Sequence, residues 1–367
     1  MVHWKALARA ARQEQAACRV AVVDGPAPML GTHMVVRPFG EMEGIETSAA
    51  EIKDLRYDLM GVARQSIADG RPRLVTVGDL RVFTDPVLPP PQLLVAGAGH
   101  VAAALAPAAL AAGFRVTVVD DRSEYAQPER FPGCAVLCEE MAAVIQRLHT
   151  DATTFIVLAG RSHEKDKEAL RAAVQQPAAY LGMVGSRRKV ATLQKELLDA
   201  GEATVWAMEQ LRAPIGLDIG AETPAEIAVA IVAELVAVRR GGSGVPLSKA
   251  GRSEREAGVP AGTLEGQRVW LALADALAQS EPCALATIVS VRGSTPRSAG
   301  ACMLVKGDGT LVGSVGGGKW EAEIRRVALA AQAPGGRPVL LAPEYLNDMD
   351  MICGGAAEVF IEPLIRR

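Results

Sequence analysis

Short, mainly apolar runs alternate with longer segments of helical periodicity through the middle of the chain. The runs Leu93–Ala96, Phe114–Val119, Thr154–Leu158 and Tyr180–Val184 have the length of strands. Runs of this kind are typical of strands that are buried on both faces of a parallel sheet. The alternation over residues 92–240 therefore predicts a doubly wound α/β domain, with helices on both faces of a parallel sheet.

The segments between these runs carry the apolar spacing and the end signals of helices. An Ala-rich stretch follows the first run and ends at Gly113, which can cap a helix. Thr223 is expected to N-cap the last helix, which opens with Pro224. The other expected elements are helices at 164–174, 187–200 and 224–238 and an extended segment at 214–219.

Two stretches rich in Pro or Gly divide the chain into three segments. Leu88–Pro91 is a short, stiff connector. Residues 241–265 contain many glycines and mixed charges, lack apolar periodicity and are interpreted as a flexible linker. The expected organisation is a first module at 1–88, the α/β domain at 92–240 and a last module at 266–367.

The two outer segments match each other in order along the chain, which predicts an internal repeat. The matching stretches are Trp4–Ala8 with Trp270–Ala274, Gly31–Val36 with Gly300–Val305, Gly70–Pro72 with Gly336–Pro338, and Arg81–Pro86 with Glu358–Pro363. The last segment predicts a small α+β fold, because a strand at 284–291 and a hairpin at 303–313 precede a helix at 319–331. The first segment should therefore have the same α+β fold.

The copies differ in three glycine-containing motifs that only the last segment contains. These motifs are Gly293-Ser294-Thr295-Pro296-Arg297, Gly316-Gly317-Gly318 and Met351-Ile352-Cys353-Gly354-Gly355. The first segment has Gly25-Pro26-Ala27-Pro28 and lacks a triple glycine and a Cys-Gly-Gly motif. We interpret residues 1–88 as a degenerate copy of the last module that keeps the fold and has lost the site.

Gly97-Ala98-Gly99-His100 follows the first strand of the α/β domain and opens a helix, which is the dinucleotide fingerprint of a Rossmann-type fold. Gly97 permits a tight turn, and Gly99 lets the backbone approach a pyrophosphate at the helix N-terminus. Asp120 or Asp121, at the end of the next strand, is placed to bind a ribose diol. The alternative is a Rossmann-type domain that serves as a scaffold or a dimer surface.

Two further loops follow strands at the carboxyl edge of the predicted sheet, where such sheets bind ligands. Ser186 and Arg187 begin a helix and are candidate phosphate ligands. The alternative for Arg187 is a solvated position in the first turn. Gly160–His163 forms the other loop, in which His163 is either functional or a loop histidine with a local hydrogen bond.

The triple glycine Gly316–Gly318 precedes a helix, so that its N–H groups can form a concavity for an anion. Arg297 or Lys319 would have to offset Glu321, because a carboxylate in the first turn opposes a phosphate. The alternative is a tight turn that requires positive φ angles. Cys353 is a candidate exposed thiolate and soft metal ligand, or else an inert core residue.

The composition is that of an ordinary globular protein, with 49% hydrophobic and 22% charged residues in 367. A net charge of −3 gives no reason to expect a nucleic acid or an anionic membrane as partner. Pro107 and Glu234 interrupt the longest apolar stretches, so no membrane span is expected. Six scattered cysteines and the lack of a secretory signal predict a reduced, cytoplasmic protein.

The three motifs of the last segment, with Glu358–Pro363, closely resemble the signature of the XdhC/CoxI family. The α/β domain resembles the Rossmann domain of that family in Gly97–His100, Gly182–Lys189 and Pro214–Pro224. The resemblance implies a chaperone that binds molybdenum cofactor (molybdopterin), supports its sulfuration with a cysteine desulfurase and inserts it into a molybdenum hydroxylase apoenzyme. Xanthine dehydrogenase and carbon monoxide dehydrogenase are hydroxylases of this type, so an accessory factor is expected rather than an enzyme.

The resemblance also implies roles for single residues. The cofactor-binding residues would be Gly316, Gly317, Gly318 and Arg297, around the pterin phosphate, and Cys353 would ligate molybdenum or lie near its exchangeable ligand. The Rossmann-type crevice would take NAD(P), another nucleotide, or the nucleotide part of a dinucleotide form of the cofactor. The signature module usually precedes the Rossmann domain in the family, whereas here the intact copy follows it. We therefore expect a homodimer in which each intact module completes the Rossmann site of its partner.

Two other functions compete with the accessory factor. An NAD(P)-dependent oxidoreductase would use His163 or His100 as acid or base, although the sequence shows no catalytic pair at a defined spacing. A structural adaptor with two vestigial sites is the third hypothesis, against which the intact glycine and cysteine motifs argue.

Overall fold

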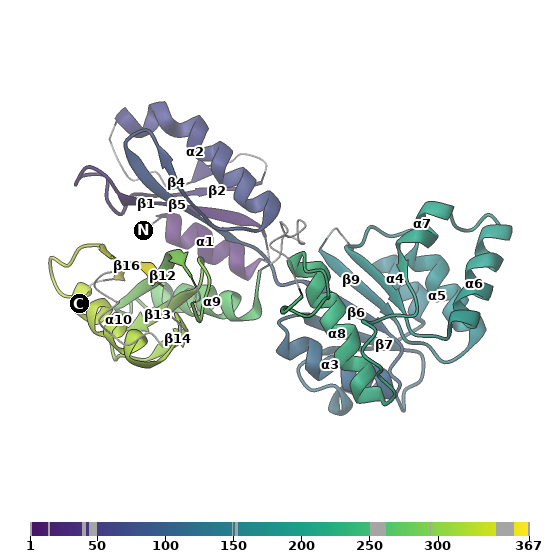
Figure 1. Ribbon diagram of the computed structural model, residues 1–367. Coiled ribbons are helices and arrows are strands. Elements are labelled where there is room, and N and C mark those ends of the chain that lie inside the picture. Colours follow the sequence, from purple (N-terminus) through teal and green to yellow (C-terminus); the bar gives the residue numbers. More distant parts are fainter. Residues whose placement is uncertain are drawn as a thin grey trace. The chain divides into compact units, whose positions relative to one another are not determined.

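The chain forms two compact units, of which one is continuous in sequence and the other is not. In the computed structural model, the described residues are 2–13, 15–38, 42–43, 50–148, 150, 153–249, 262–293, 295–342 and 356–365. Unit 1 combines Met1–Pro89 with Gly262–Arg367, and unit 2 is Pro90–Ala261 (Figure 1). The two outer segments of the sequence therefore belong to one unit, and the middle segment forms the other.

Unit 2 is built on a six-stranded sheet in the order β11-β10-β9-β6-β7-β8, and the paired strands are parallel. The strands are β6 (Gln92–Ala96), β7 (Arg115–Asp120), β8 (Ala135–Cys138), β9 (Thr154–Leu158), β10 (Tyr180–Met183) and β11 (Leu211–Arg212). Counted along the chain, this is the doubly wound Rossmann order. The predicted fold class of this domain is therefore confirmed.

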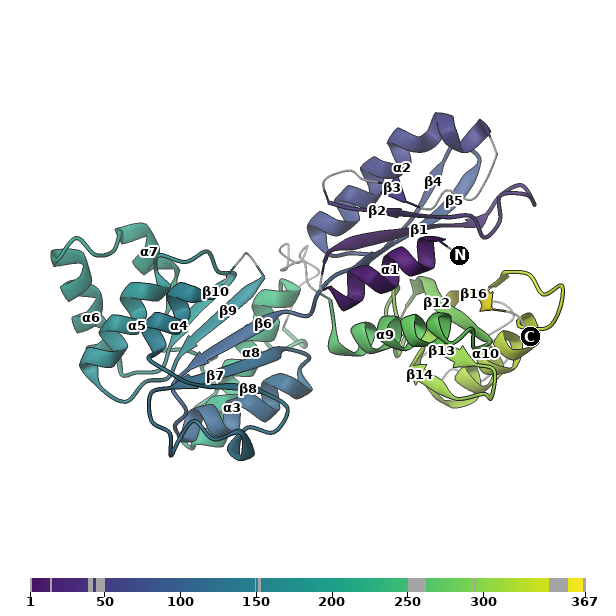
Figure 2. The ribbon, with the colours of Figure 1, turned by 180° about the vertical axis from the view of Figure 1, so that it is seen from behind.

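Helices cover both faces of the sheet in unit 2, as Figure 2 shows. The helices are α3 (His100–Ala111), α4 (Met141–Arg147), α5 (His163–Ala173), α6 (Arg187–Asp199), α7 (Val205–Gln210) and α8 (Pro224–Arg240), with a 3₁₀ turn at Pro128–Arg130. α3 and α8 share one core with the sheet, and α4 to α7 share the other. Among the described residues, no helix has both the length and the apolar character to cross a membrane.

One predicted element of unit 2 is wrong. The extended segment was expected at Pro214–Ile219, but the edge strand β11 is Leu211–Arg212, paired with Leu181 and Gly182 of β10. Proline has no backbone N–H to donate to a sheet, so the strand ends before Pro214. Thr223 caps α8 as predicted, and its side chain and that of Glu226 form a reciprocal capping box.

Unit 1 contains two five-stranded antiparallel sheets with corresponding strand orders, β3-β2-β1-β5-β4 and β14-β13-β12-β16-β15. The first module comprises α1 (Val2–Arg12), β1 (Ala17–Asp24), β2 (His33–Val36), β3 (Met42–Glu43), α2 (Ala50–Asp69), β4 (Arg73–Val77) and β5 (Leu80–Val87). The second comprises α9 (Leu264–Ala278), β12 (Cys283–Arg292), β13 (Cys302–Lys306), β14 (Leu311–Gly313), α10 (Gly318–Ala331), β15 (Val339–Leu341) and β16 (Ala356–Ile365).

The two modules share an irregularity as well as a strand order. The pairing of β1 with β5 shifts register between Val22 and Asp24, and that of β12 with β16 shifts between Ile288 and Ser290. These positions correspond in the repeat. A shared bulge at the same rung indicates that the two copies have one fold, as the sequence matches predicted.

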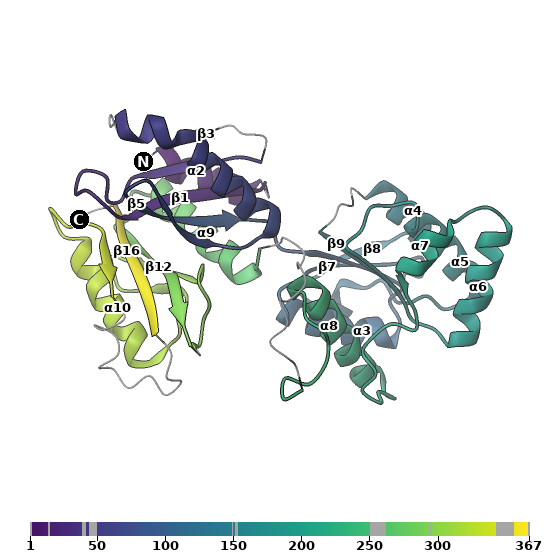
Figure 3. The same cartoon turned by 45° about the horizontal axis from the view of Figure 1, so that its top comes forward.

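The modules pack against each other within unit 1 (Figure 3). A shared core joins Trp4 and Leu7 of α1 to Trp270 and Leu273 of α9. A second shared cluster contains Phe83 of β5 and Phe360 of β16 together with other core residues. The intact module therefore has the degenerate copy as its neighbour in the same chain.

Candidate functional site

The glycine loop after β6 lies where the sheet changes its winding direction. The strand order places β6 between β7 and β9, so the connections of the domain leave this point in opposite directions. Ligands of open α/β sheets bind in the crevice at the carboxyl ends of such strands. The Ala159 N–H, directly after β9, donates to the Ala96 carbonyl at 2.7 Å, which ties the two strand ends together.

Gly97 and Gly99 have different reasons to be glycine. Gly97 has a φ of 117°, and a Cβ atom at this residue would overlap the carbonyl oxygen of Ala159. Gly99 has an ordinary φ of −71°, and a Cβ atom there would meet nothing within 4 Å. Gly97 is therefore required by the turn, whereas Gly99 keeps open the space in front of the helix.

The N-terminus of α3, like that of α4, lacks the side-chain cap that the other helices of unit 2 have. The N-cap residues of α5, α6, α7 and α8 are Ser162, Ser186, Thr204 and Thr223, whose hydroxyl groups accept a backbone N–H. The N-cap of α3 is Gly99, which gives no side-chain hydrogen bond, and His100 is the exposed first residue of the helix. The first turn of α3, at the positive end of a helix dipole, thus has no side-chain cap in the described part of the chain, and the space around the Gly99 Cβ position is open.

Asp120 is held by the protein itself. One carboxylate oxygen accepts the Ala98 N–H at 2.8 Å, and Arg122 donates from Nε and Nη2 at 2.8 and 2.9 Å. Burial alone would raise the pKa of Asp120, but the hydrogen bonds from Arg122 and from the Ala98 backbone outweigh it and lower the pKa to about 2. The ionised side chain therefore fixes the glycine loop to the end of β7.

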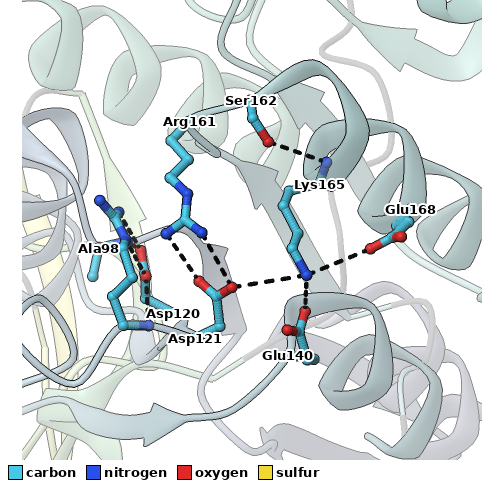
Figure 4. Close-up of polar contacts among 9 residues, drawn as sticks. Ala98, Asp120, Asp121, Glu140, Arg161, Ser162, Lys165 and Glu168 are labelled. Atoms are coloured by element: carbon cyan, nitrogen blue, oxygen red, sulfur yellow. Dashed lines mark hydrogen bonds and ion pairs between the residues drawn. The ribbon is translucent and has the colours of Figure 1, made fainter.

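Asp121 is the more accessible carboxylate at this edge, and Figure 4 shows its partners. Arg161 donates to both of its oxygens at 3.2 and 3.3 Å, and the ammonium group of Lys165 lies 3.8 Å away. Lys165 also donates to Glu140 at 2.6 Å. Residues directly after β7, directly before α4, in the loop after β9 and in α5 thus form one charged network beside the glycine loop.

Arg122 and Lys165 were not singled out in the sequence. Arg122 lies over the ring of Tyr125, 3.7 Å from its centroid, so its guanidinium group is fixed between a carboxylate and an aromatic face. The sequence signal for these residues was the run Asp120-Asp121-Arg122 at the end of a strand. Charges of both signs at the carboxyl end of a buried strand point to a site, but they do not show which charges pair.

Ser186 and Arg187 begin α6 after β10, and β9 separates that strand from β6. The Ser186 hydroxyl accepts the Lys189 N–H at 3.2 Å, and Arg187 is exposed. His163 contacts Glu196 of α6, with 3.0 Å between Nε2 and Oε1. The role of Ser186 and Arg187 as phosphate ligands stays a prediction.

In the intact module of unit 1, two of the three sequence motifs lie together. Arg297 donates from Nε to the carbonyl oxygen of Ser314 at 3.3 Å, and it pairs with Glu265. A Cβ atom on Gly316 would lie 3.6 Å from Cβ of Pro296. The loop that carries Arg297 therefore packs against the loop that carries the triple glycine.

The triple glycine forms a turn whose N–H groups already bind a carboxylate. Gly316, Gly317 and Gly318 have φ angles of 137°, 79° and 65°, which side chains rarely adopt. Oε2 of Glu321 accepts the Ser314 hydroxyl at 2.6 Å and the Val315 and Gly317 N–H groups at 3.2 Å each. The loop is thus an anion site whose anion is Glu321 itself, and a phosphate would have to replace that carboxylate.

A buried donor that has no acceptor among the described residues lies beside this loop. The indole Nε1 of Trp320 is buried and has no hydrogen-bond partner in the part of the chain that the structure describes. Cδ1 of the same ring is 4.0 Å from where a Gly316 Cβ would lie. A buried N–H is normally paired, so this one is available to an acceptor atom of a ligand.

The third motif lies outside the described residues, and Cys353 with it. The described chain resumes at Ala356, which pairs with Arg292 at the end of β12. Arg292 directly precedes the Gly293–Arg297 motif in the sequence. The assignment of Cys353 as a metal ligand stays a prediction.

Fold and site together define a protein with a Rossmann-fold domain and a pair of α+β modules, of which one carries the glycine motifs. A family model described as the XdhC Rossmann domain matches residues 93–235, and one described as the XdhC and CoxI family matches residues 276–341. The chain belongs to the XdhC/CoxI family.

Two curated proteins and one crystal structure are similar to this chain. The "Uncharacterized protein YqeB" of Escherichia coli is 33% identical over 258 residues, covering 64% of this chain and 46% of that protein. A probable xanthine dehydrogenase subunit of Bacillus subtilis is 32% identical over 163 residues, covering 43% and 46%. The chain spans about half the length of these relatives. A xanthine dehydrogenase structure from Bacillus halodurans is 18% identical, with a TM-score of 0.40 over 65% of this chain and 95% of that one.

Proposed function

We propose that the protein is an accessory factor that binds molybdenum cofactor, supports its sulfuration with a cysteine desulfurase, and delivers it to a molybdenum hydroxylase of the xanthine or carbon monoxide dehydrogenase type. Membership in the XdhC/CoxI family supports this function, as does the description of one relative as a probable xanthine dehydrogenase subunit. The cofactor is cargo in this proposal, so the protein has to hold it and then release it.

The observation that carries the proposal is the open start of α3 at Gly99. Its backbone N–H groups lie at the positive end of a helix dipole and have no side-chain acceptor. A pyrophosphate is the ligand group that matches this arrangement, because it supplies several acceptor oxygens and a negative charge. We assign this position to the nucleotide part of a dinucleotide form of the cofactor, to NAD(P) or to another nucleotide.

The ribose of such a nucleotide would meet Asp121 rather than Asp120. Both oxygens of Asp120 already accept hydrogen bonds from the protein, and this residue is 3% exposed. Within the described residues, Asp121 is bound only through Arg161 and the more distant Lys165, both of which can rearrange at the surface. Of the two acidic residues that the fingerprint allows, we therefore assign the ribose role to Asp121.

The pterin end of the cofactor is assigned to the intact module. Arg297 and the Trp320 indole N–H are donors near the triple glycine, and the Gly316–Gly318 backbone becomes available once Glu321 swings away. The thiolate of Cys353 is a soft donor suited to molybdenum. In this arrangement the chain's residues bind phosphate and metal, and exchange of Glu321 for phosphate accompanies loading.

A homodimer is part of the proposal, in which the intact module of each chain serves the Rossmann site of its partner. Analytical ultracentrifugation of the cofactor-loaded chain tests it. A dimer is the expected result. A monomer that binds the cofactor with full affinity would contradict the exchange between chains.

Metal and pterin analysis after purification from cells that make the cofactor tests the function directly. We expect molybdenum and pterin to be retained together with the chain. Titration of the purified protein with NADH, beside purified molybdenum cofactor, separates this function from an NAD(P)-dependent oxidoreductase. Binding and turnover of NADH without retention of pterin or molybdenum would overturn the proposal in favour of the oxidoreductase.

A further inference from the structure

The two modules of unit 1 are related by an approximate twofold arrangement. A Cβ atom on Gly31 would lie 2.6 Å from Cγ of Pro338, and one on Gly300 would lie 2.9 Å from Cγ of Pro72. Gly31 corresponds to Gly300 in the repeat, and Pro72 corresponds to Pro338. The same glycine–proline contact is thus made twice, once in each direction, as in a symmetric dimer.

The ion pairs across this arrangement are not symmetric. Nη2 of Arg81, in β5, lies 3.0 Å from Oε2 of Glu358, in β16. These two residues occupy the same position in their modules, because Arg81 pairs with Asp24 of β1 and Glu358 pairs with Ser290 of β12. Two identical intact modules would bring two Glu358 carboxylates together here. The first module removes that repulsion by presenting an arginine.

A second arginine of the first module contacts the same strand, β16. Nη1 of Arg19 lies 2.6 Å from Oε2 of Glu362. Arg19 corresponds to Leu285 of β12, because Arg19 pairs with Asp85 of β5 and Leu285 pairs with Glu362 of β16. At both positions the first module is basic where the intact module is apolar or acidic, and both cations pair with the Glu358–Glu362 stretch.

The loop that carries Arg297 also rests on the first module. Gly300 lies in this loop, two residues before β13 begins at Cys302, and Pro72 fills the space that a side chain at Gly300 would need. Pro72, Arg81 and Arg19 therefore contact the loop after β12 and the strand that follows the cysteine motif. They do so from a module that has lost the motifs itself.

We infer that the first module is a built-in partner that positions the cofactor-binding motifs of the intact module, and that Arg81 is a positioning residue of this site. The inference rests on the proposed function, because it assigns residues of the first module to the same cofactor site. Arg81 is suited to this role, since it binds Glu358 near the start of β16 without being buried in the core. Its side chain is 34% exposed, and that of Glu358 is 16% exposed.

A matched pair of variants of the full chain tests this inference. Arg81→Gln removes the ion pair beside the motifs. Arg12→Gln removes another ion pair between the modules, from Nη2 of Arg12 in α1 to Asp275 in α9 at 2.6 Å, and it serves as the control. The measurements are retention of purified molybdenum cofactor in ultrafiltration and the melting temperature of each variant.

We expect Arg81→Gln to weaken cofactor retention by about tenfold while Arg12→Gln leaves it unchanged, with similar melting temperatures for both. The charge-swapped variant Arg81→Glu with Glu358→Arg should recover most of the retention. Wild-type retention by Arg81→Gln, or an equal loss in both single variants, would overturn the inference and leave the proposed function intact. Failure of the wild-type chain to retain cofactor would overturn both.

Discussion

Arg19 and Glu362 form a buried ion pair that joins the two modules of unit 1. Their guanidinium and carboxylate atoms are 2.6 Å apart, and the side chains are 0% and 2% exposed. The arginine also lies 5.7 Å from the ring centroid of Trp4 and 5.9 Å from that of Trp270, which correspond in the repeat. One cation of the first module thus lies between paired tryptophans and neutralises a carboxylate of the second.

Replacing this arginine by the residue of the other copy should destabilise unit 1. We expect Arg19→Leu to lower the free energy of unfolding by about 3–5 kcal/mol, because the buried Asp85 would lose its arginine partner and Glu362 would keep the His33 imidazole but lose the guanidinium. Chemical denaturation of the full chain measures the change. Adding Glu362→Gln to the variant should recover part of the loss. A loss below about 1 kcal/mol would mean that the pair contributes little.

The sequence predicted the fold of each domain better than the contacts between residues far apart in the chain. Apolar runs and glycine turns located β6, β7 and β9, because a strand buried on both faces leaves a local signal. The repeat was visible because both modules keep matching core positions. That the modules would pack on each other was not visible, since the contacts of Arg19 and Arg81 join residues far apart in the chain.

The candidate site was located only in part for the same reason. The fingerprint correctly placed Gly97 and Gly99 between the first strand of the domain, β6, and the start of α3. It could not show that Arg122 would fill the hydrogen-bonding capacity of Asp120. In the last module, Glu321 was recognised as opposing a phosphate, but not as the acceptor for the loop N–H groups, because that depends on a side-chain conformation.

The two fingerprint glycines should respond differently to substitution. Gly97→Ala should lower the free energy of unfolding by several kcal/mol, because the new Cβ overlaps the Ala159 carbonyl at a positive φ. Gly99→Val should leave stability within about 1 kcal/mol and weaken nucleotide or cofactor binding at least tenfold, since its side chain fills the space before α3. Unfolding curves and titration calorimetry separate the effects. Undiminished binding by a folded Gly99→Val would remove the crevice from the site.

The hydrogen bonds of Asp120 should make unit 2 sensitive to acid. The folded state lowers the pKa of this group to about 2, from an ordinary value of 3.8. Its stabilising contribution is therefore complete above pH 4 and is lost as the pH falls toward 2. Allowing for solvent screening, it amounts to about 1–2 kcal/mol. Unfolding measured between pH 5 and pH 2 should have a shallower pH dependence in Asp120→Asn, and identical slopes would contradict the assignment.

Removing the charge of Glu321 should favour an incoming anion. In Glu321→Gln the amide oxygen can still accept the Ser314 hydroxyl and the Gly317 N–H, so the loop keeps its shape. The negative charge that competes with a phosphate is gone, and affinity for molybdenum cofactor should rise by about tenfold. Equilibrium binding at two salt concentrations measures the change. A decrease in affinity would show that the glycine loop does not exchange its own carboxylate for the ligand.

Cys353→Ala tests the assignment of molybdenum to the intact module. A thiolate is a soft ligand, and losing it should weaken retention of the cofactor, molybdenum and pterin together, while the melting temperature is preserved. The matched control is Cys138→Ala, which removes an exposed thiol from the end of β8 in the Rossmann domain. Metal and pterin contents are measured for both variants after purification from the same cells. Loss of molybdenum and pterin in Cys353→Ala alone is the expected result, whereas equal contents in both variants would exclude Cys353 from the site.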